Sequence, residues 1–221
     1  AYEDAVEAVA LRRLLPAVPG IAEILVVGKI VHAATDGIPG LGSIDAVVLD
    51  APATGHGMSL VGAPAVVAQT VAAGPLADDA RHLQERLGDP GFSRFHLVTT
   101  PEEMPVTESV ELYRRLGVDA GMPLGAVLLN QVSENGLTSR ELEAVGALSG
   151  APMSPGVCSA IDAARFMTDT FELQRTHVTR LRGQVPLPVV SLPDVSAVRE
   201  VARRVEVLAE HLDARFWREA R

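Results

Sequence analysis

The sequence of 221 residues has one cysteine, Cys158, and one lysine, Lys29. A single cysteine cannot form a disulfide within the chain, and it cannot supply the several thiolates of a cysteine-rich zinc site. This cysteine usage predicts a reducing, cytoplasmic compartment. The formal net charge is -9 and no basic stripe occurs, so nucleic-acid binding is not expected.

Long hydrophobic runs are missing as well. No apolar run reaches the roughly 18 residues that a membrane span requires. The longest candidate, residues 58–74, is interrupted by Gly62, Pro64 and Gln69, and no signal peptide is expected from the first residues. With 48% hydrophobic and 21% charged residues, the composition predicts a globular domain with a sizeable core and no stable membrane insertion.

Strand-like and helix-like segments alternate along the chain. Short β-branched or apolar runs predict strands at residues 46–50, 94–100, 125–131 and 186–192. Helical periodicity predicts helices at residues 2–15, 21–34, 58–73, 76–87, 102–116, 138–148, 161–181 and 195–217. Thr138 or Ser139 is the expected N-cap of its helix, and residues 151–156 are expected to form a loop. This alternation predicts an α/β fold with a mostly parallel sheet flanked by helices.

Polar residues cluster where the predicted strands end. The clusters lie at residues 50–56, 99–102, 130–131 and 192–194. Because ligands of parallel sheets bind beyond the carboxyl ends of the strands, these clusters are expected to converge on one site.

Asp50 follows an apolar run directly, and it has two interpretations. An aspartate in this place holds the Mg²⁺ coordination sphere of many nucleotidases, because Mg²⁺ prefers carboxylate oxygen and retained water. Such an aspartate can equally cap the next turn. The following Thr54, Gly55 and His56 favour the first interpretation, since Gly55 lets backbone N–H groups approach an anion and the other two add side-chain donors.

Three other candidate motifs are incomplete. Residues 57–59 begin a serine-hydrolase nucleophile elbow, but the pattern needs glycine where Val61 stands. His56 has no second histidine or cysteine at zinc-ligand spacing. Lys29 is followed by Ile30 in place of a hydroxyl residue, and no upstream glycine sits where a phosphate loop requires it.

Asn130 ends an apolar strand and also has two interpretations. It is a strand-end turn residue, or it recognises adenine, because a carboxamide can accept from the exocyclic amine and donate to a ring nitrogen. The residues alone leave both open.

Taken in order, these motifs resemble one family, the anion-transporting ATPases of the arsenite-pump type, which include the ATPase that targets tail-anchored membrane proteins. The family's switch II signature is D-T-A-P-T-G-H-T, and residues 50–57 read DAPATGHG, with Asp, Thr, Gly and His in place. Residues 19–23 resemble its "PGIDE" helix start, residues 98–102 its "VTxPE" strand end and residues 129–132 its "VNQ" adenine strand. The resemblance covers most of residues 16–207.

The resemblance implies a deviant P-loop NTPase fold with a small helical subdomain. Residues 1–221 would form a single partial P-loop-type ATPase domain, with helical subdomain pieces at about 1–36 and 58–90 and a further candidate piece at 151–181. The implied cofactors are ATP and Mg²⁺. The implied site residues are Asp50 for the metal and catalysis, Thr54, Gly55 and His56 for the γ-phosphate switch, and Asn130, Gln131, Leu192 and Pro193 for the adenine base.

The resemblance also implies partners: a homodimer or a heterodimer with a related ATPase subunit that closes around nucleotide, and a hydrophobic protein cargo. The sequence departs from the family in three features. It lacks the family's N-terminal strand, the family's glycine- and lysine-rich phosphate loop and the family's switch I aspartate. Without them phosphoryl transfer lacks its main electrostatic stabilisation, so this chain alone is expected to be inactive.

Two explanations of that departure stay open. The abrupt helical start favours a native protein with a further N-terminal region. The alternative is a degenerate subunit that pairs with a complete ATPase and serves as a binding scaffold. In a third interpretation residues 153–171, which carry methionine and phenylalanine, bind an apolar helix, whereas ordinary core packing would explain the same residues.

Overall fold

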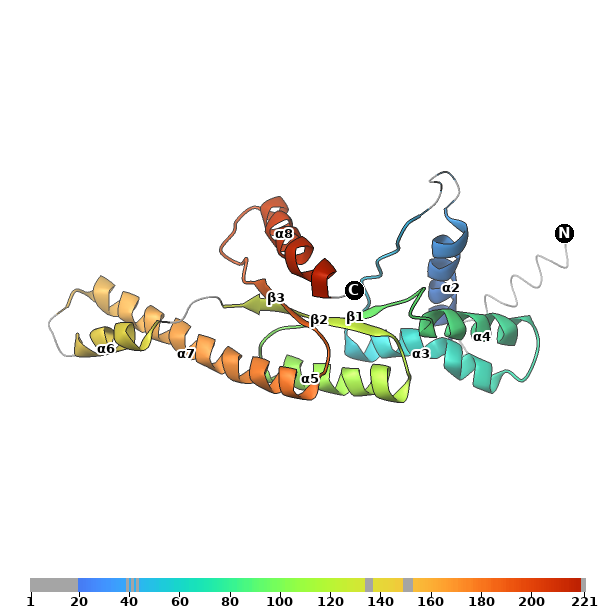
Figure 1. Ribbon diagram of the computed structural model, residues 1–221, viewed down its shortest axis with the longest axis horizontal. Helices are drawn as coiled ribbons and strands as arrows, with labels where there is room; N and C mark the ends of the chain where they lie inside the picture. Colours follow the sequence, from blue (N-terminus) through green and yellow to red (C-terminus); the bar gives the residue numbers. More distant parts are fainter. Residues whose placement is uncertain are drawn as a thin grey trace. The chain divides into compact units, whose positions relative to one another are not determined.

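The computed structural model describes residues 20–38, 40, 42, 44–133, 137–148 and 153–219, and Figure 1 shows its helices and strands. The helix expected at residues 2–15 lies outside the described residues. The chain divides into two compact units. Unit 1 extends to Arg94 and includes Ala120–Pro123, whereas unit 2 contains Phe95–Asp119 and the chain from Leu124 onward.

Unit 1 is a cluster of three helices. They are α2 (Ile21–Asp36), α3 (Thr54–Thr70) and α4 (Pro75–Gly88), and each packs against the other two. Proline at the first position of α4 suits a helix start, because its fixed φ is helical and the missing N–H would have no partner there. The shared core consists of Ile24, Val27, Val31, Leu60, Ala63, Val67, Ala80 and Leu83. Burial of these apolar side chains is the main stabilising contribution within the cluster.

Unit 2 is built on a parallel sheet. Its strands are β1 (Phe95–Thr99), β2 (Leu124–Val132) and β3 (Val189–Pro193), in the order β1-β2-β3. Val127 of β2 lies opposite Leu97 on one side and Val189 on the other. These three strands confirm the predictions made from the apolar runs, and the predicted parallel α/β fold class is correct.

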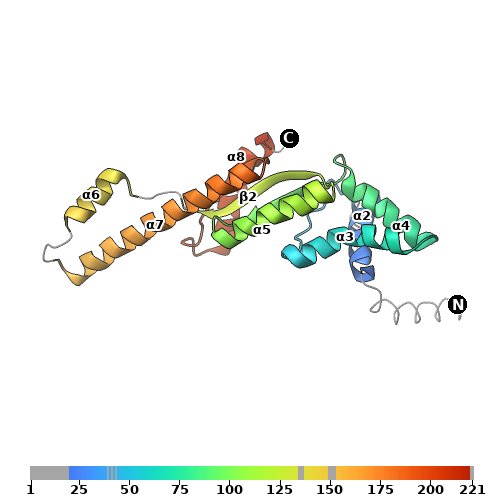
Figure 2. The same cartoon turned by 90° about the horizontal axis from the view of Figure 1, so that it is seen from below.

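Unit 2 also contains helices, which lie along the chain between and after these strands. They are α5 (Glu103–Tyr113), which continues into the π-helix η1 (Arg114–Asp119), α6 (Ser139–Ala147), α7 (Pro155–Gln184) and α8 (Val201–Glu219). Figures 1 and 2 show α8 on one face, above β3, and α5 and α7 side by side on the other. Thr138 caps α6 as predicted. The only cysteine, Cys158, is exposed in the first turn of α7.

The strand predicted at residues 46–50 is wrong. These residues have no regular structure, and Val48 is 93% exposed. Their β-branched composition supplies strand propensity, but a strand also needs a neighbour with which to form a ladder, and no described segment pairs with them.

Three helix starts also differ from expectation. Helix α3 begins at Thr54 rather than residue 58, so Thr54, Gly55 and His56 belong to its first turn. Helix α7 begins at Pro155 rather than residue 161, again with proline in the first turn. Helix α8 begins at Val201 rather than residue 195, because the preceding segment forms a turn of its own.

Candidate functional site

The carboxyl end of β2 leaves the regular ladder. The register shifts between Leu129 and Val132, and Gln131 has a φ of +59°, which is rare outside glycine. Asn130 is half-buried and Gln131 is exposed. No hydrogen bond joins the Asn130 carboxamide to another described residue, and a carboxamide offers both donor and acceptor groups.

The end of β3 lies directly beside this bend. Pro193 is the register partner of Val132, and the Asp194 N–H donates to the Val132 carbonyl at 3.3 Å. Leu192 is buried and Pro193 is half-buried. Four of the predicted site residues therefore come together at one edge of the sheet: Asn130, Gln131, Leu192 and Pro193.

The loop after β3 is held by α8. The Asp194 carboxylate accepts from the Ser196 N–H at 2.8 Å, which forms a side-chain turn. Arg204 donates from Nε to the Val198 carbonyl and from Nη2 to the Ser196 carbonyl. Sequence analysis missed Arg204, because its partners are backbone carbonyls that no residue pattern reveals.

Asp50 and the residues after it make a different kind of site. Asp50 is exposed in an irregular segment, and Gly55 and His56 are exposed in the first turn of α3. The N-cap of α3 is Ala53, which has no side-chain acceptor, and the Ala53 carbonyl accepts from the His56 and Gly57 N–H groups at 3.1 and 3.3 Å.

A close backbone contact explains one residue of this segment. A Cβ at Gly57 would lie 2.7 Å from the Pro52 carbonyl oxygen, so only glycine fits without a shift of the chain. The glycine thus lets the segment after Asp50 fold back closely against the start of α3.

The predicted site residues fall into two sets, one in each unit. Unit 1 contains Asp50, Thr54, Gly55 and His56, and unit 2 contains Asn130, Gln131, Leu192 and Pro193. Each set is a separate candidate site within its own unit. Asp50 is the predicted metal ligand, and the described residues contain no group of three or more side chains that could hold a metal. A single carboxylate still fits Mg²⁺ in a nucleotide site, because phosphates and water supply most of its ligands there.

Among the described helices, none combines the length and apolar character that a bilayer-spanning helix needs.

The fold and the strand-end residues define an α/β protein with a candidate ligand site at the carboxyl edge of its sheet. No protein-family model matches the sequence. The chain is similar to the protein named putative ATPase Mb3704 of Mycobacterium bovis, and to those named putative ATPase MT3781 and ATPase BagA of Mycobacterium tuberculosis. Each is 26% identical over 199 residues, which cover 80% of this chain and 56% of the relative. The chain thus spans about half the length of the curated relatives it matches.

Proposed function

We propose that this chain is the part of an ATPase of the arsenite-pump and tail-anchored-targeting type that carries switch II and the adenine-binding strand. The observation that carries the proposal is the meeting of Asn130 and Gln131 with Leu192 and Pro193 at one edge of a parallel sheet. Distant similarity to proteins named ATPase supports ATP chemistry. The order of the sequence motifs supports the specific type.

The β2–β3 edge would bind the adenine base. The carboxamide of Asn130 can accept from the exocyclic amine and donate to a ring nitrogen at the same time. Gln131 continues the polar edge, and the half-buried Pro193 offers apolar surface for the flat face of the base, whereas Leu192 is buried and leaves little surface for contact. Recognition of both hydrogen-bonding groups would distinguish adenine from bases that present the opposite pattern.

The Asp50 segment of unit 1 would bind phosphate and Mg²⁺. Bound Mg²⁺ neutralises phosphate charge, and the exposed Asp50 carboxylate would help to hold it through direct or water-mediated contact. The N-terminus of α3 has no side-chain cap, and the helix dipole favours a negative charge beside it. Thr54, Gly55 and His56 would report the γ-phosphate, and α3 would pass any displacement on to its packed neighbours α2 and α4.

A complete reaction needs more than these residues. A glycine-rich loop with lysine would have to come from elsewhere in the native protein or from a partner subunit. The proposed partner is a second copy or a related ATPase subunit, with closure of the dimer around Mg-ATP and reopening after hydrolysis. The full reading frame that encodes this chain distinguishes the two sources of the loop.

Mg-ATP binding and turnover by the full-length protein test the metal role. Asp50→Ala is expected to lower turnover at least about tenfold, since the variant loses a Mg²⁺ contact worth more than about 1.4 kcal/mol in the transition state. Asp45→Ala is the matched control, because Asp45 is exposed in the same irregular segment. Equal affinity and equal turnover in wild type and Asp50→Ala would remove Asp50 from the mechanism.

A scaffold function is the second candidate, and the exposure of α7 favours it. Phe166 is 73% exposed and Met167 is 59% exposed, so core packing does not account for them. They would bind an apolar helix, and the probe is a synthetic apolar helical peptide of about 20 residues. Peptide binding that survives Asp50→Ala but fails when Phe166 and Met167 become serine would favour this function. Loss of binding in Asp50→Ala alone would contradict a scaffold independent of nucleotide.

A further inference from the structure

One side chain of α7 contacts both sides of the bend at the end of β2. The Gln174 Oε1 atom accepts from the Ser133 N–H at 2.9 Å, and its Nε2 atom donates to the Gln131 carbonyl at 3.3 Å. The partners lie 41 and 43 residues away in sequence. A carboxamide has one acceptor and one donor end, and here each end meets the complementary backbone group.

The two hydrogen bonds lie on either side of Val132, and one of them is made by the carbonyl of a strained residue, Gln131. Gln131 has a φ of +59°, a conformation that a non-glycine residue adopts only when its surroundings hold it. The bend also carries the register shift between Leu129 and Val132. Because the φ of Gln131 sets the direction of the chain beside Asn130, the Gln174 contacts fix how both residues are presented.

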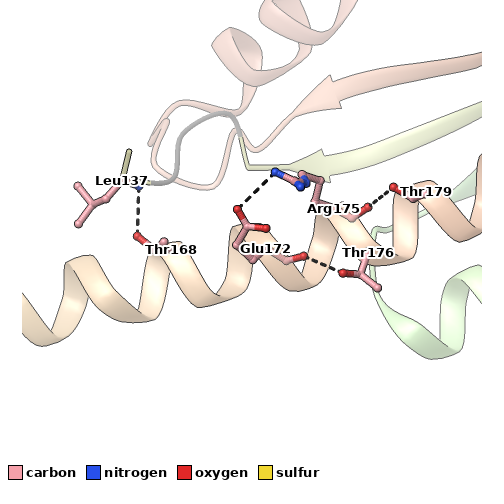
Figure 3. A network of polar contacts seen from close by, with 6 residues as sticks. All are labelled: Leu137, Thr168, Glu172, Arg175, Thr176 and Thr179. Atoms are coloured by element: carbon pink, nitrogen blue, oxygen red, sulfur yellow. Dashed lines mark hydrogen bonds and ion pairs between the residues drawn. The ribbon is translucent and has the colours of Figure 1, made fainter. Parts of the chain in front are cut away.

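A second α7 side chain holds the chain on its way to α6. The Thr168 hydroxyl is buried, donates to the Ala164 carbonyl at 2.9 Å and accepts from the Leu137 N–H at 3.2 Å (Figure 3). The neighbouring polar contacts of α7 in the same view, such as Glu172 with Arg175, stay within the helix. Thr168 and Gln174 are thus two points at which α7 binds described residues between the end of β2 and the start of α6.

We propose that Gln174 is a positioning residue for the nucleotide-binding edge, and that through it α7 controls the affinity of that edge. This inference rests on the proposed function, because it assigns a regulator to the same site. Gln174 holds Gln131 in its left-handed conformation, and this conformation keeps Asn130 available to the base. A tilt of α7 that weakens the Gln174 contacts lowers nucleotide affinity without any direct contact between α7 and the nucleotide.

The competing explanation is that Gln174 only attaches α7 to the sheet. Gln131→Gly separates the two, because glycine adopts a φ near +60° at no steric cost and no longer needs to be held. Under the positioning role, Gln174→Met has a large effect in wild type and a small effect in the Gln131→Gly background. Under simple attachment, the effect of Gln174→Met is the same in both backgrounds.

The experiment measures ADP binding by the full-length protein and hydrogen exchange at the Ser133 amide. Gln174→Met is expected to weaken ADP binding about tenfold and to speed Ser133 exchange at least about tenfold, since two hydrogen bonds are lost. In the Gln131→Gly background the loss of ADP affinity is expected to fall to about twofold or less. Gln184→Met is the matched control, an exposed glutamine at the end of the same helix, and it should leave both readouts unchanged.

Each outcome either supports or overturns the positioning role of Gln174. A smaller effect of Gln174→Met in the Gln131→Gly background supports positioning, and equal effects in both backgrounds overturn it. Wild-type ADP binding that Gln174→Met leaves unchanged overturns positioning while the proposed function stands. Absence of ADP binding by the wild type overturns both proposals, and Ser133 exchange would then still report whether the hydrogen bond forms.

Discussion

The two candidate sites, the β2–β3 edge of unit 2 and the Asp50 segment of unit 1, differ in how the surrounding structure holds them. At the β2–β3 edge, side chains from α7 and α8 hold the backbone, through Gln174 on one strand end and Arg204 on the loop after the other. The Asp50 segment is exposed and irregular, and the close contact between Pro52 and Gly57 is the constraint that the structure describes there. A recognition surface gains from rigidity, whereas a phosphate sensor has to change conformation, so the contrast agrees with a base site and a switch.

The largest expected effect is a loss of stability in the sheet that carries the β2–β3 edge. Leu129 is 0% exposed in the central strand, next to Asn130, so Leu129→Ala removes buried methyl groups and leaves a cavity. We expect a loss of about 2–5 kcal/mol in the free energy of unfolding, measured by urea denaturation. Leu173→Ala is the control, because Leu173 is 60% exposed, and it should change stability by less than about 0.5 kcal/mol. Equal losses would contradict the burial of the sheet described here.

A smaller effect on stability is expected in the Asp50 segment and the helix that follows it. Gly57→Ala places a Cβ 2.7 Å from the Pro52 carbonyl oxygen, so the chain must shift, at a cost of about 1–3 kcal/mol. Gly62→Ala in the same helix meets nothing within 4 Å and should stabilise by about 0.5–1 kcal/mol through helix propensity. Thermal unfolding of both variants checks the opposite signs. The same sign in both would mean that the contact with Pro52 does not constrain the segment.

The smallest effect is expected at the N-terminus of α6, where Thr138 and Glu141 form the helix cap. The Thr138 hydroxyl and N–H both donate to the Glu141 carboxylate, at 2.7 and 2.8 Å, and they lower the pKa of Glu141 below its ordinary value. Because the pKa of Glu141 is lower in the folded state than in the unfolded state, its hydrogen bonds with Thr138 stabilise the fold at pH values above the unfolded-state pKa. This stabilisation is lost as the pH falls through the folded-state pKa of Glu141.

Hydrogen exchange of the first-turn amides of α6, followed from neutral to acid pH, measures this effect. Protection in wild type should decrease as Glu141 is protonated, after correction for the intrinsic exchange rate. Glu141→Gln should show lower protection at neutral pH and no such step. A step of equal size in the variant would assign the pH dependence to another group.

Most of the correct fold prediction came from helical periodicity, short apolar runs and a helix N-cap. Residues 21–34 match α2, the apolar runs match β1 to β3, and Thr138 caps α6 as its hydroxyl and the glutamate three residues later predict. These features are local, so the sequence pattern contains them. Residues 46–50 failed because strand composition says nothing about which segment supplies the ladder partner.

The candidate site was predictable only in part. Chain order placed Asn130 and Leu192 at strand ends, and a parallel sheet brings such ends to one edge. The bend at Gln131 was not predictable, because its support comes from Gln174, 43 residues away, and glutamine is an ordinary residue in an exposed helix. The division of the site residues between two units likewise depends on tertiary contacts that no local pattern contains.

Helix α7 has the geometry of a lever arm. Cys158 and Gln174 are sixteen residues apart on it, a separation of roughly 24 Å at 1.5 Å per residue. A rotation of about 10° at the Gln174 fulcrum would therefore sweep the far end through roughly 4 Å, given this arm length. The exposed Cys158 thiol sits at that far end and has no competing thiol in the sequence. A fluorophore attached there would amplify small rearrangements at the strand edge into a displacement that can be read directly.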